Sequence, residues 1–225
     1  MLSKIKLVAL SLFTLVVFNF SNANAQGFVI GMKYNNAAVP NMNTELVWNI
    51  NKGNCKLQMK TQYEGRNVSS FFYTDVAGNS IKMLEENPAN QKKIFYTINI
   101  NSLMPDARFD YKRGRANILN ETKTIAGISC KKVEYTTDKF TCEFWLAESL
   151  PDVKSWSRFF QSYPELNAIA EAGLSGFPLA STVKDLLGNL LASFETTEVK
   201  PTQFSASDFI VPSDYIDASK LERKK

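Results

Sequence analysis

The strongest constraint on this fold is an alternation of apolar and polar residues with a period of two, which recurs along most of the chain. It is clearest over residues 28–34, 46–50, 55–63 and 94–100, and further strand-forming segments lie at 68–74, 81–84, 118–124, 128–135 and 140–146. Successive side chains of a strand point to opposite faces of a sheet, so this period predicts half-buried strands. A spacing of about ten residues per strand predicts a meandering antiparallel sheet.

The period changes after Pro151. Asp152 is a common type of helix cap, and four aromatic residues follow at the i, i+3, i+4, i+7 spacing of a helix face: Trp156, Phe159, Phe160 and Tyr163. This pattern predicts a helix that begins at Asp152, and a second short helix after Pro164 that ends at Gly173. The aromatic stripe either packs on the sheet as ordinary core or closes the mouth of an open barrel.

Residues 180–192 fit two alternatives. They can form a pair of strands joined near Gly188-Asn189, or a helical turn at 183–187, because the apolar residues there have no decisive period.

The N-terminus has the pattern of an export signal. Lys4 and Lys6 precede an apolar run at 7–18, and Ala23-Asn24-Ala25 matches a small-x-small cleavage site. We therefore expect a signal peptide at 1–25 cleaved after Ala25, and a single β-rich domain at 26–225 with a charged flexible tail at 220–225. The apolar run is shorter than the roughly 20 residues of a membrane span, and no cysteine near the cleavage site offers a lipid acceptor. The expected location is periplasmic or secreted, and the protein is not expected to be an integral membrane protein.

Composition excludes several kinds of chemistry. The chain has no histidine, which removes Ser-His-Asp and Cys-His catalysis and histidine-ligated metals. Ser175 lies between glycines, but without the spacing of a nucleophile elbow. Glu143, Glu148 and Asp152 can converge as an acid pair for glycoside hydrolysis, or can simply decorate a surface and cap a helix. We expect no enzyme activity, no cofactor and no metal site.

The charge balance gives no sign of a nucleic-acid partner. The chain has 26 basic and 22 acidic residues, and residues 1–25 carry two lysines and no acid, so the expected mature region has 24 basic against 22 acidic residues. A nucleic-acid-binding protein usually has a strong basic excess.

Cys55, Cys130 and Cys142 can form at most one disulfide, with one thiol left over. Cys130 and Cys142 lie on consecutive strands and face each other if the turn between them is about five residues long, centred on Thr136. A tighter turn at Asp138-Lys139 would place Cys130 opposite Ala147 instead. The further alternative is three small buried thiols.

Four segments of the second half resemble exported bacterial proteins of unknown function, with an order of segments comparable to that of the GLPGLI family. They are 125–133 (IAGISCKKV), 145–151 (WLAESLP), 176–179 (GFPL) and 209–215 (FIVPSDY). The resemblance covers roughly the last hundred residues. It implies a lipoprotein-carrier-like half-barrel of the LolA/LolB type, a curved antiparallel sheet wrapped around short helices.

Two functions follow as hypotheses. In the first, the curved sheet and the aromatic stripe enclose an apolar cavity for a hydrophobic ligand or a lipoprotein acyl chain, lined by Trp48, Phe71, Phe95, Trp145, Trp156, Phe159 and Phe160. In the second, the protein is an interaction or structural protein of the cell envelope with a packed core and no small-molecule ligand. Alternation looks the same around a filled core and around a cavity, so the two remain open.

Overall fold

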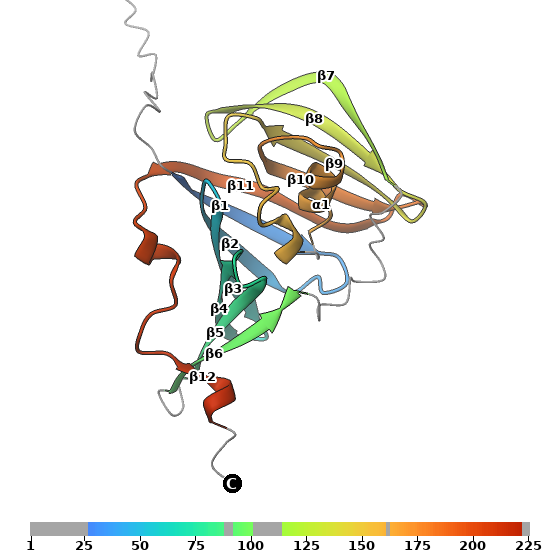
Figure 1. Cartoon of the computed structure of the whole chain (residues 1–225). Coiled ribbons are helices and arrows are strands. Elements are labelled where there is room, and N and C mark those ends of the chain that lie inside the picture. Colours follow the sequence, from blue (N-terminus) through green and yellow to red (C-terminus); the bar gives the residue numbers. More distant parts are fainter. Residues whose placement is uncertain (1–26, 88–91, 101–113, 161–162, 222–225) are drawn as a thin grey trace, which may run out of the picture.

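The computed structural model describes residues 27–87, 92–100, 114–160 and 163–221 (Figure 1). The expected signal peptide at 1–25 and residues 222–225 of the expected tail lie outside this part of the chain. The described strands form one sheet in the order β12-β6-β5-β4-β3-β2-β1-β11-β10-β9-β8-β7. The strands are β1 (Gly27–Asn36), β2 (Asn43–Asn51), β3 (Asn54–Tyr63), β4 (Arg66–Asp75), β5 (Ser80–Asn87), β6 (Lys92–Asn99), β7 (Arg115–Ile125), β8 (Ile128–Thr136), β9 (Phe140–Ala147), β10 (Phe177–Asp185), β11 (Leu190–Thr202) and β12 (Ile216–Asp217).

The predicted fold class is confirmed: the protein is mainly β, with a single open curved sheet and short helical elements. All neighbouring strands pair antiparallel except β12, which runs parallel to β6. The chain meanders from β1 to β6, and β11 then returns to pair with β1, which joins the two halves of the sheet.

The ambiguous residues 180–192 are strands. A turn joins β10 to β11, and the Asp185 carboxylate holds it by accepting hydrogen bonds from the backbone N–H of Leu187 at 3.0 Å and of Asn189 at 2.8 Å. The Asn189 side-chain amide also donates to Asp185, at 2.8 Å. These hydrogen bonds lower the pKa of Asp185, with the Asn189 side chain the largest cause. The hydrogen bonds of this turn therefore explain why residues 180–192 form two strands, although the apolar period there favours neither strand nor helix.

The helix expected from Asp152 to Tyr163 is wrong. In its place the chain makes turns and one 3-10 helix at Ser157–Phe159, and the α-helix α1 runs only over Pro164–Glu171. Asp152 does not cap a helix, because its carboxylate accepts from the backbone N–H of Lys154 in a local turn. Proline at the first position of α1 fits its fixed φ, so the second predicted helix is confirmed.

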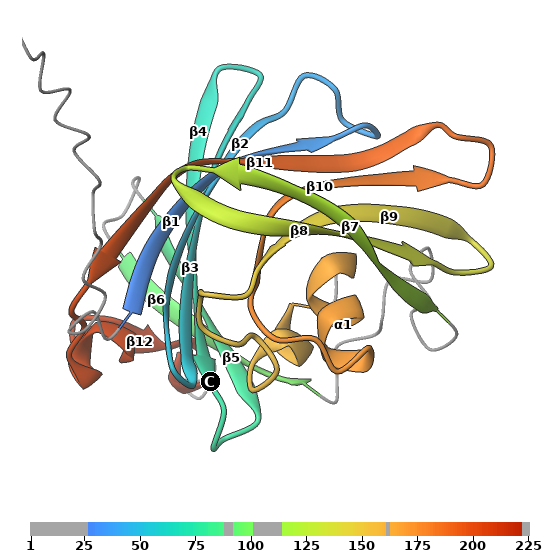
Figure 2. The same ribbon diagram turned by 90° about the horizontal axis from the view of Figure 1, so that it is seen from above.

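The sheet curves around the connection between β9 and β10, which contains α1 (Figure 2). We call residues 148–160 and 163–176 of this connection the plug. One hydrophobic core joins the plug to the concave face of the sheet, the face that carries Ile30, Leu46, Trp48, Ile50 and Leu57. This core positions the candidate site described below.

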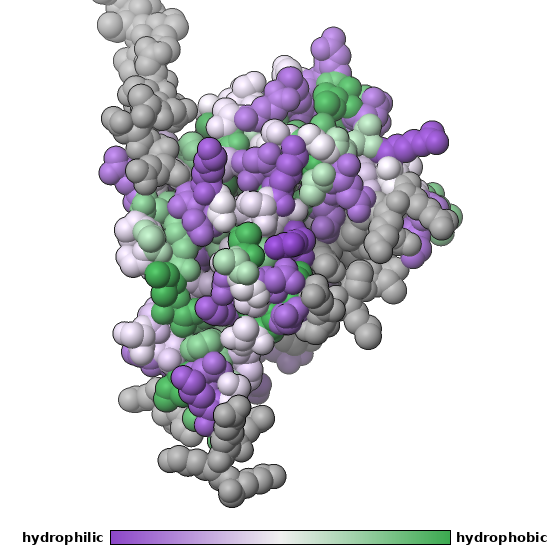
Figure 3. Space-filling model, in the orientation of Figure 1, coloured by the Kyte–Doolittle hydropathy of each residue, from purple (hydrophilic) through white to green (hydrophobic). Residues whose placement is uncertain are grey.

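The opposite face of β3–β6 is crossed by the C-terminal segment, residues 203–217, which appears in red in Figure 1. Phe209 of this segment is buried, and Lys93 holds Asp214 with an N–O distance of 2.9 Å. Figure 3 shows apolar surface along this edge of the molecule, where Ile210 is 63% and Ile216 is 48% exposed. The segment ends in β12, which pairs with Ile94 and Phe95 of β6.

Of the alternatives for the cysteines, the structure has three free and buried thiols, and no disulfide joins Cys130 to Cys142. The turn between β8 and β9 is the tighter alternative, because Thr136 pairs with Thr141 and the N–H of Thr137 donates to the Phe140 carbonyl at 3.0 Å. This register places Tyr135 opposite Cys142. Burial raises the pKa of the Cys130 thiol to about 11, so this thiol is a poor nucleophile.

Alkylation of the protein under denaturing, non-reducing conditions is expected to modify all three cysteines, because each thiol is free. Intact mass spectrometry counts the modified groups. The folded protein should react far more slowly, since all three side chains are buried. Modification of one cysteine only, rising to three after reduction, would show that a disulfide forms in solution.

Candidate functional site

The centre of the concave face is an aromatic cluster built around Trp48 of β2. The Trp48 ring lies 4.9 Å from Phe160, 5.5 Å from Tyr163 and 5.8 Å from Trp156, measured between ring centroids. Phe177, at the start of β10, lies 5.8 Å away. One tryptophan of the sheet therefore contacts three aromatic residues of the plug and one at the strand that follows it. Such offset and edge-to-face pairs contribute about 0.5–1.5 kcal/mol each beyond the burial of their area.

Of the seven residues predicted to line a cavity, the structure brings four to this face. Trp48, Trp156, Phe159 and Phe160 are all at most 5% exposed. They form part of a packed core, in which the Trp156 and Phe160 rings are 5.9 Å apart. The alternation around Trp48 is the signal that placed it correctly, since Leu46 and Ile50 share its face.

The other three predicted residues are not brought to this face. Phe71 lies opposite Leu84 on the neighbouring strand, and Leu84 lies opposite Phe95. All three point to the face of the sheet opposite to that of Phe72, which packs against the core. Phe95 lines a surface groove beside the C-terminal segment. The prediction chose the wrong phenylalanine of the Phe71-Phe72 pair, because a shift of one residue in a strand changes the face.

Trp145 also lies on the opposite face from the core residue Phe144, its neighbour in β9. It is half-buried and lines an outer groove, where the Lys123 ammonium lies 5.6 Å from its ring centroid. The prediction that Trp145 lines the cavity is therefore wrong, because consecutive residues of a strand point to opposite faces of the sheet.

The boundary between plug and sheet contains a void of about 10 Å³. Its lining residues are Met32, Leu46, Trp48, Tyr163, Glu165, Leu166, Phe177, Pro178 and Phe194. A volume of this size holds about one water molecule. Among the described residues, the space between plug and sheet is thus filled by side chains in this conformation.

Three polar atoms buried in this region have no hydrogen-bond partner: the indole nitrogens of Trp48 and Trp156 and Oε2 of Glu165. More than nine in ten buried polar groups in folded proteins are hydrogen-bonded. Leaving one unpaired costs about 1–3 kcal/mol. The aromatic cluster is therefore well packed but poorly satisfied in its hydrogen bonding.

Glu165, in the first turn of α1, is a charged residue type inside the core, with 3% of its surface exposed. Its Oε1 accepts a hydrogen bond from Ser181 Oγ, which lies 3.6 Å from Cys142 Sγ. Burial raises the pKa of the Glu165 carboxyl, and the hydrogen bond from Ser181 opposes that shift in part. Burial also raises the pKa of Cys142 well above its usual range, so the cluster lacks a reactive thiolate. Sequence reasoning missed Glu165, because an acid in the first turn of a helix is usually exposed and carries no local sign of burial.

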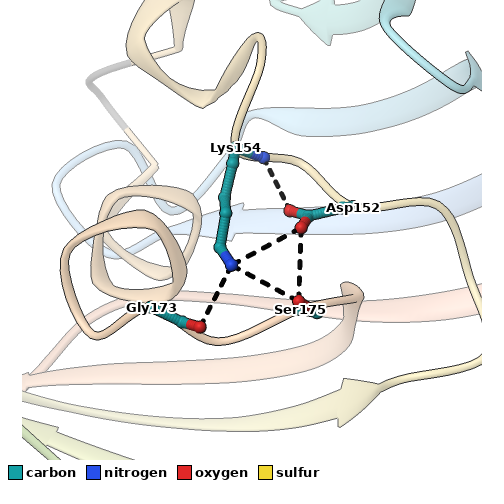
Figure 4. Close-up of polar contacts among 4 residues, drawn as sticks. All are labelled: Asp152, Lys154, Gly173 and Ser175. Atoms are coloured by element: carbon teal, nitrogen blue, oxygen red, sulfur yellow. Dashed lines mark hydrogen bonds and ion pairs between the residues drawn. The ribbon is translucent and has the colours of Figure 1, made fainter.

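Polar contacts at the surface tie the two ends of the plug together (Figure 4). The Lys154 ammonium donates to the Gly173 carbonyl at 3.0 Å and to Ser175 Oγ at 3.3 Å. Ser175 Oγ donates in turn to Asp152 Oδ2 at 3.3 Å. We call these four residues the latch. Ser175, considered above as a nucleophile, lies here in a structural contact on an exposed surface.

The three candidate acids do not converge. Glu143 pairs with Lys132 at 3.1 Å, Glu148 pairs with Lys131 at 2.8 Å, and Asp152 belongs to the latch. In the part of the chain that the structure describes, no three cysteine or acidic side chains are grouped as metal ligands. No helix there is long and apolar enough to cross a membrane.

The fold and this site define a mainly β protein whose curved sheet wraps a plug from its own chain. The chain belongs to the DUF4412 family, a domain of unknown function, which it matches over residues 29–215. This match confirms the expectation that the chain belongs to a family of unknown function. The resemblance to the GLPGLI family stays a prediction. Comparison with curated proteins gives no match.

Several solved structures are similar to the chain. A chain of the Pseudomonas aeruginosa MucA/MucB complex is 12% identical with a TM-score of 0.46, over 86% of this chain and 58% of that one. An uncharacterized conserved protein from Thermus thermophilus is 10% identical, with a TM-score of 0.44, over 86% and 91% of the two chains. A domain from Vibrio parahaemolyticus, described as a putative outer membrane lipoprotein-sorting protein domain, is 13% identical with a TM-score of 0.33, over 81% and 88%. This chain spans a little over half the length of the Pseudomonas chain.

Replacement of Glu165 by Gln is expected to change how stability depends on pH. The raised pKa means that the folded state binds the Glu165 proton more tightly than the unfolded state does. The free energy of unfolding therefore falls as pH rises from the ordinary glutamate pKa of about 4.3 toward the raised value. Glu165→Gln removes this loss, so its stability relative to wild type should increase with pH across that interval. Urea unfolding between pH 4 and pH 8 measures the free energy of unfolding of both proteins. If the two free energies change with pH in the same way, the pKa of Glu165 is not raised in the folded state.

Proposed function

We propose that the protein binds an acyl-type apolar ligand on the concave face of its sheet, beneath the plug. The observation that carries the proposal is the boundary between plug and sheet, where aromatic residues pack closely while three buried polar atoms stay unpaired. A boundary built only for stability would satisfy these groups or replace them with apolar ones. An imperfect boundary is easier to open.

The plug has little regular structure of its own. Its helical elements span three and eight residues, too short to be stable without packing on the sheet. Its attachment is fixed at one end by Gly176, whose φ is 119° and where a Cβ atom would lie 2.4 Å from the Ala147 carbonyl oxygen. The exposed latch ties the ends together at the surface. Opening of this segment therefore requires the exposed latch contacts to break.

A ligand that replaces the plug must offset the contacts the plug gives up. Each buried methylene contributes about 0.8 kcal/mol, so an acyl chain of twelve carbons supplies roughly 9 kcal/mol of apolar burial. The residues it would contact are those the plug now covers, with Trp48 at their centre. We propose a binding role rather than catalysis, because this face carries apolar residues and a single acid.

We further propose that the protein works in the cell envelope after export. The N-terminal pattern of Lys4, Lys6 and Ala23-Asn24-Ala25 supports export. A hydrophobic ligand in that compartment would be a lipid or the acyl chain of a lipoprotein.

A second candidate is an envelope interaction protein whose plug never opens. The small size of the void, about 10 Å³, favours it. In that case partners would bind the outer surface, where β7 forms one edge of the described sheet. The experiments below separate the two candidates, since the second predicts no ligand beneath the plug.

Native mass spectrometry tests the proposal directly. The full chain, expressed in bacteria and purified without detergent or solvent, is expected to carry an added mass that organic extraction removes. After extraction, the ligand-free protein should bind added methyl laurate. A bare mass that stays bare after incubation with methyl laurate would contradict ligand binding and favour the packed alternative.

Removal of the latch is expected to speed ligand uptake. Lys154→Ala deletes the donor to Gly173 and Ser175, so the plug should open about two- to fivefold more readily, as expected for exposed polar contacts. Stopped-flow fluorescence with an acyl-chain probe measures the rate. Lys82→Ala is the matched control, because it deletes a surface ion pair with Asp75 in the groove beside the C-terminal segment and not in the latch. Equal rates in both variants would show that the latch does not limit opening.

A further inference from the structure

A groove of about 620 Å³ lies on the outer face of the sheet, the face opposite to the plug. Strand register explains its first row of side chains. Trp145 of β9 lies opposite Ala180 of β10, Ala180 lies opposite Glu195 of β11, and Glu195 lies opposite Lys33 of β1. Residues that lie opposite each other on paired strands share a face, so these four form one continuous row across the sheet.

A second row runs beside the first and explains why the surface is hollow. It consists of Glu143 on β9, Thr182 on β10, Ser193 on β11 and Asn35 on β1. The side chains at the centre of the two rows are small, those of Ala180, Thr182 and Ser193, and the larger ones lie at the ends. A trough therefore runs over β10 and β11, and its volume is within the range of roughly 300–1,000 Å³ that is usual for small-molecule sites.

Three further residues of the lining belong to the other face of the sheet. Tyr34 contacts Tyr163 of the plug, with the ring centroids 6.0 Å apart, and Ser181 donates to Glu165 of the plug. Phe194 is 5% exposed and belongs to the core. The side chains of these residues are thus engaged on the concave face, so the recognition of a ligand in the groove depends on the two outer rows, on Lys123 and on the turn at residues 40–43.

Trp145 offers an apolar surface to this otherwise polar groove. It is half-buried, and the Lys123 ammonium lies over its ring, 5.6 Å from the centroid. An ammonium is attracted to the face of an indole ring, and both residues line the groove. The ring face beneath Lys123 is therefore not packed against the core. Lys123 is exposed and its side chain is long and flexible, so a ligand can take its place on the ring.

Charge and topology restrict the kind of ligand that fits. Two lysines and two acids line the groove, Lys33 and Lys123 against Glu143 and Glu195, so it favours neither an anion nor a cation. The strands β9, β10, β11 and β1 each have a neighbour on both sides. Their backbone groups are used in the sheet, so an extended peptide cannot bind here by strand addition. Recognition must come from side chains.

The polar side chains of the groove include amides and hydroxyls, which both donate and accept hydrogen bonds. They are those of Asn35, Asn41, Asn43, Thr182 and Ser193. A sugar ring matches this combination, because its hydroxyls donate and accept at the rim while its C–H groups form an apolar face that stacks on an aromatic ring.

We propose that the outer groove binds a neutral oligosaccharide, with one sugar ring stacked on Trp145 and its hydroxyls bonded to the polar side chains of the two rows. The groove extends over four strands, or roughly 14 Å between the outermost two, and so takes more than one sugar ring. This site lies on the face opposite to the plug. It therefore does not depend on the proposed binding of an acyl ligand beneath the plug.

Tryptophan fluorescence of the full-length protein tests the proposal. The chain has three tryptophans, and Trp48 and Trp156 are at most 2% exposed, so a sugar that stacks on the surface reports through Trp145. Cellohexaose, chitohexaose and maltohexaose are titrated separately. At least one of them is expected to change the emission in a saturable way, with nearly the same affinity at low and high salt, because the ligand is neutral.

Calorimetric titration of variants with the sugar that binds locates the site. Trp145→Ala should weaken binding at least about tenfold, and Trp145→Tyr, which keeps an aromatic ring, should retain most of the affinity. Phe71→Ala is the matched control, because Phe71 is also a half-buried aromatic residue of the outer face but does not line the groove. Ser193→Tyr fills the floor of the groove and leaves Trp145 in place, and it should also weaken binding at least about tenfold.

The proposal is overturned if none of the three sugars changes the fluorescence of the wild-type protein. It is also overturned if the affinity is unchanged in folded Trp145→Ala or Ser193→Tyr protein, or if Phe71→Ala weakens binding as much as Trp145→Ala does. If Trp145→Ala does not fold, Ser193→Tyr and the wild-type titration still decide the matter. None of these outcomes depends on whether methyl laurate binds beneath the plug.

Discussion

The contact between Trp48 and the plug is the interaction on which the rest of this structure depends. An open curved sheet buries one face only if something fills its concavity, and here the filling comes from the connection between β9 and β10. Trp48 contacts Trp156, Phe160 and Tyr163, so one side chain of the sheet anchors most of the aromatic surface of the plug. Without the plug, the apolar residues of β1 to β3 would face solvent.

The same contact explains why the plug is a compromise between packing and hydrogen bonding. Large aromatic rings fill the concavity efficiently, but tryptophan brings an N–H that needs an acceptor. The backbone oxygens of the paired strands are already used in strand pairing, and most side chains around the two indoles are rings and aliphatic groups. The indole nitrogens of Trp48 and Trp156 therefore stay unpaired. Each such group weakens the attachment of the plug relative to an apolar ring of the same size.

Much of the fold follows from the sequence, because period-two alternation is a local property that a strand requires wherever it lies. The strands β1 to β9 each overlap a segment identified by alternation or β-forming residues. The helix expected from Asp152 is wrong for a related reason: an aromatic residue every three or four positions indicates burial, and the plug buries these residues through turns and one short 3-10 helix instead of an α-helix. The void and the latch bring together residues from separate segments of the chain, and no local pattern encodes them.

The register of single strands marks the limit of what parity can predict. Phe71-Phe72 and Phe144-Trp145 each offer two apolar neighbours, and which member faces the core depends on its cross-strand partner. Cys130 shows the same dependence, since the turn at Asp138-Lys139 decides what lies opposite.

A plug from the same chain also sets how tightly any ligand on this face can bind. The plug occupies the site at a very high effective concentration, so the measured affinity of a ligand equals its intrinsic affinity reduced by the fraction of molecules that are open. A fully satisfied plug would make that fraction vanishingly small. Unpaired atoms at Trp48, Trp156 and Glu165 raise it, because they weaken the attachment of the plug to the sheet. The unpaired polar groups of the core thus favour a ligand by weakening the plug that competes with it.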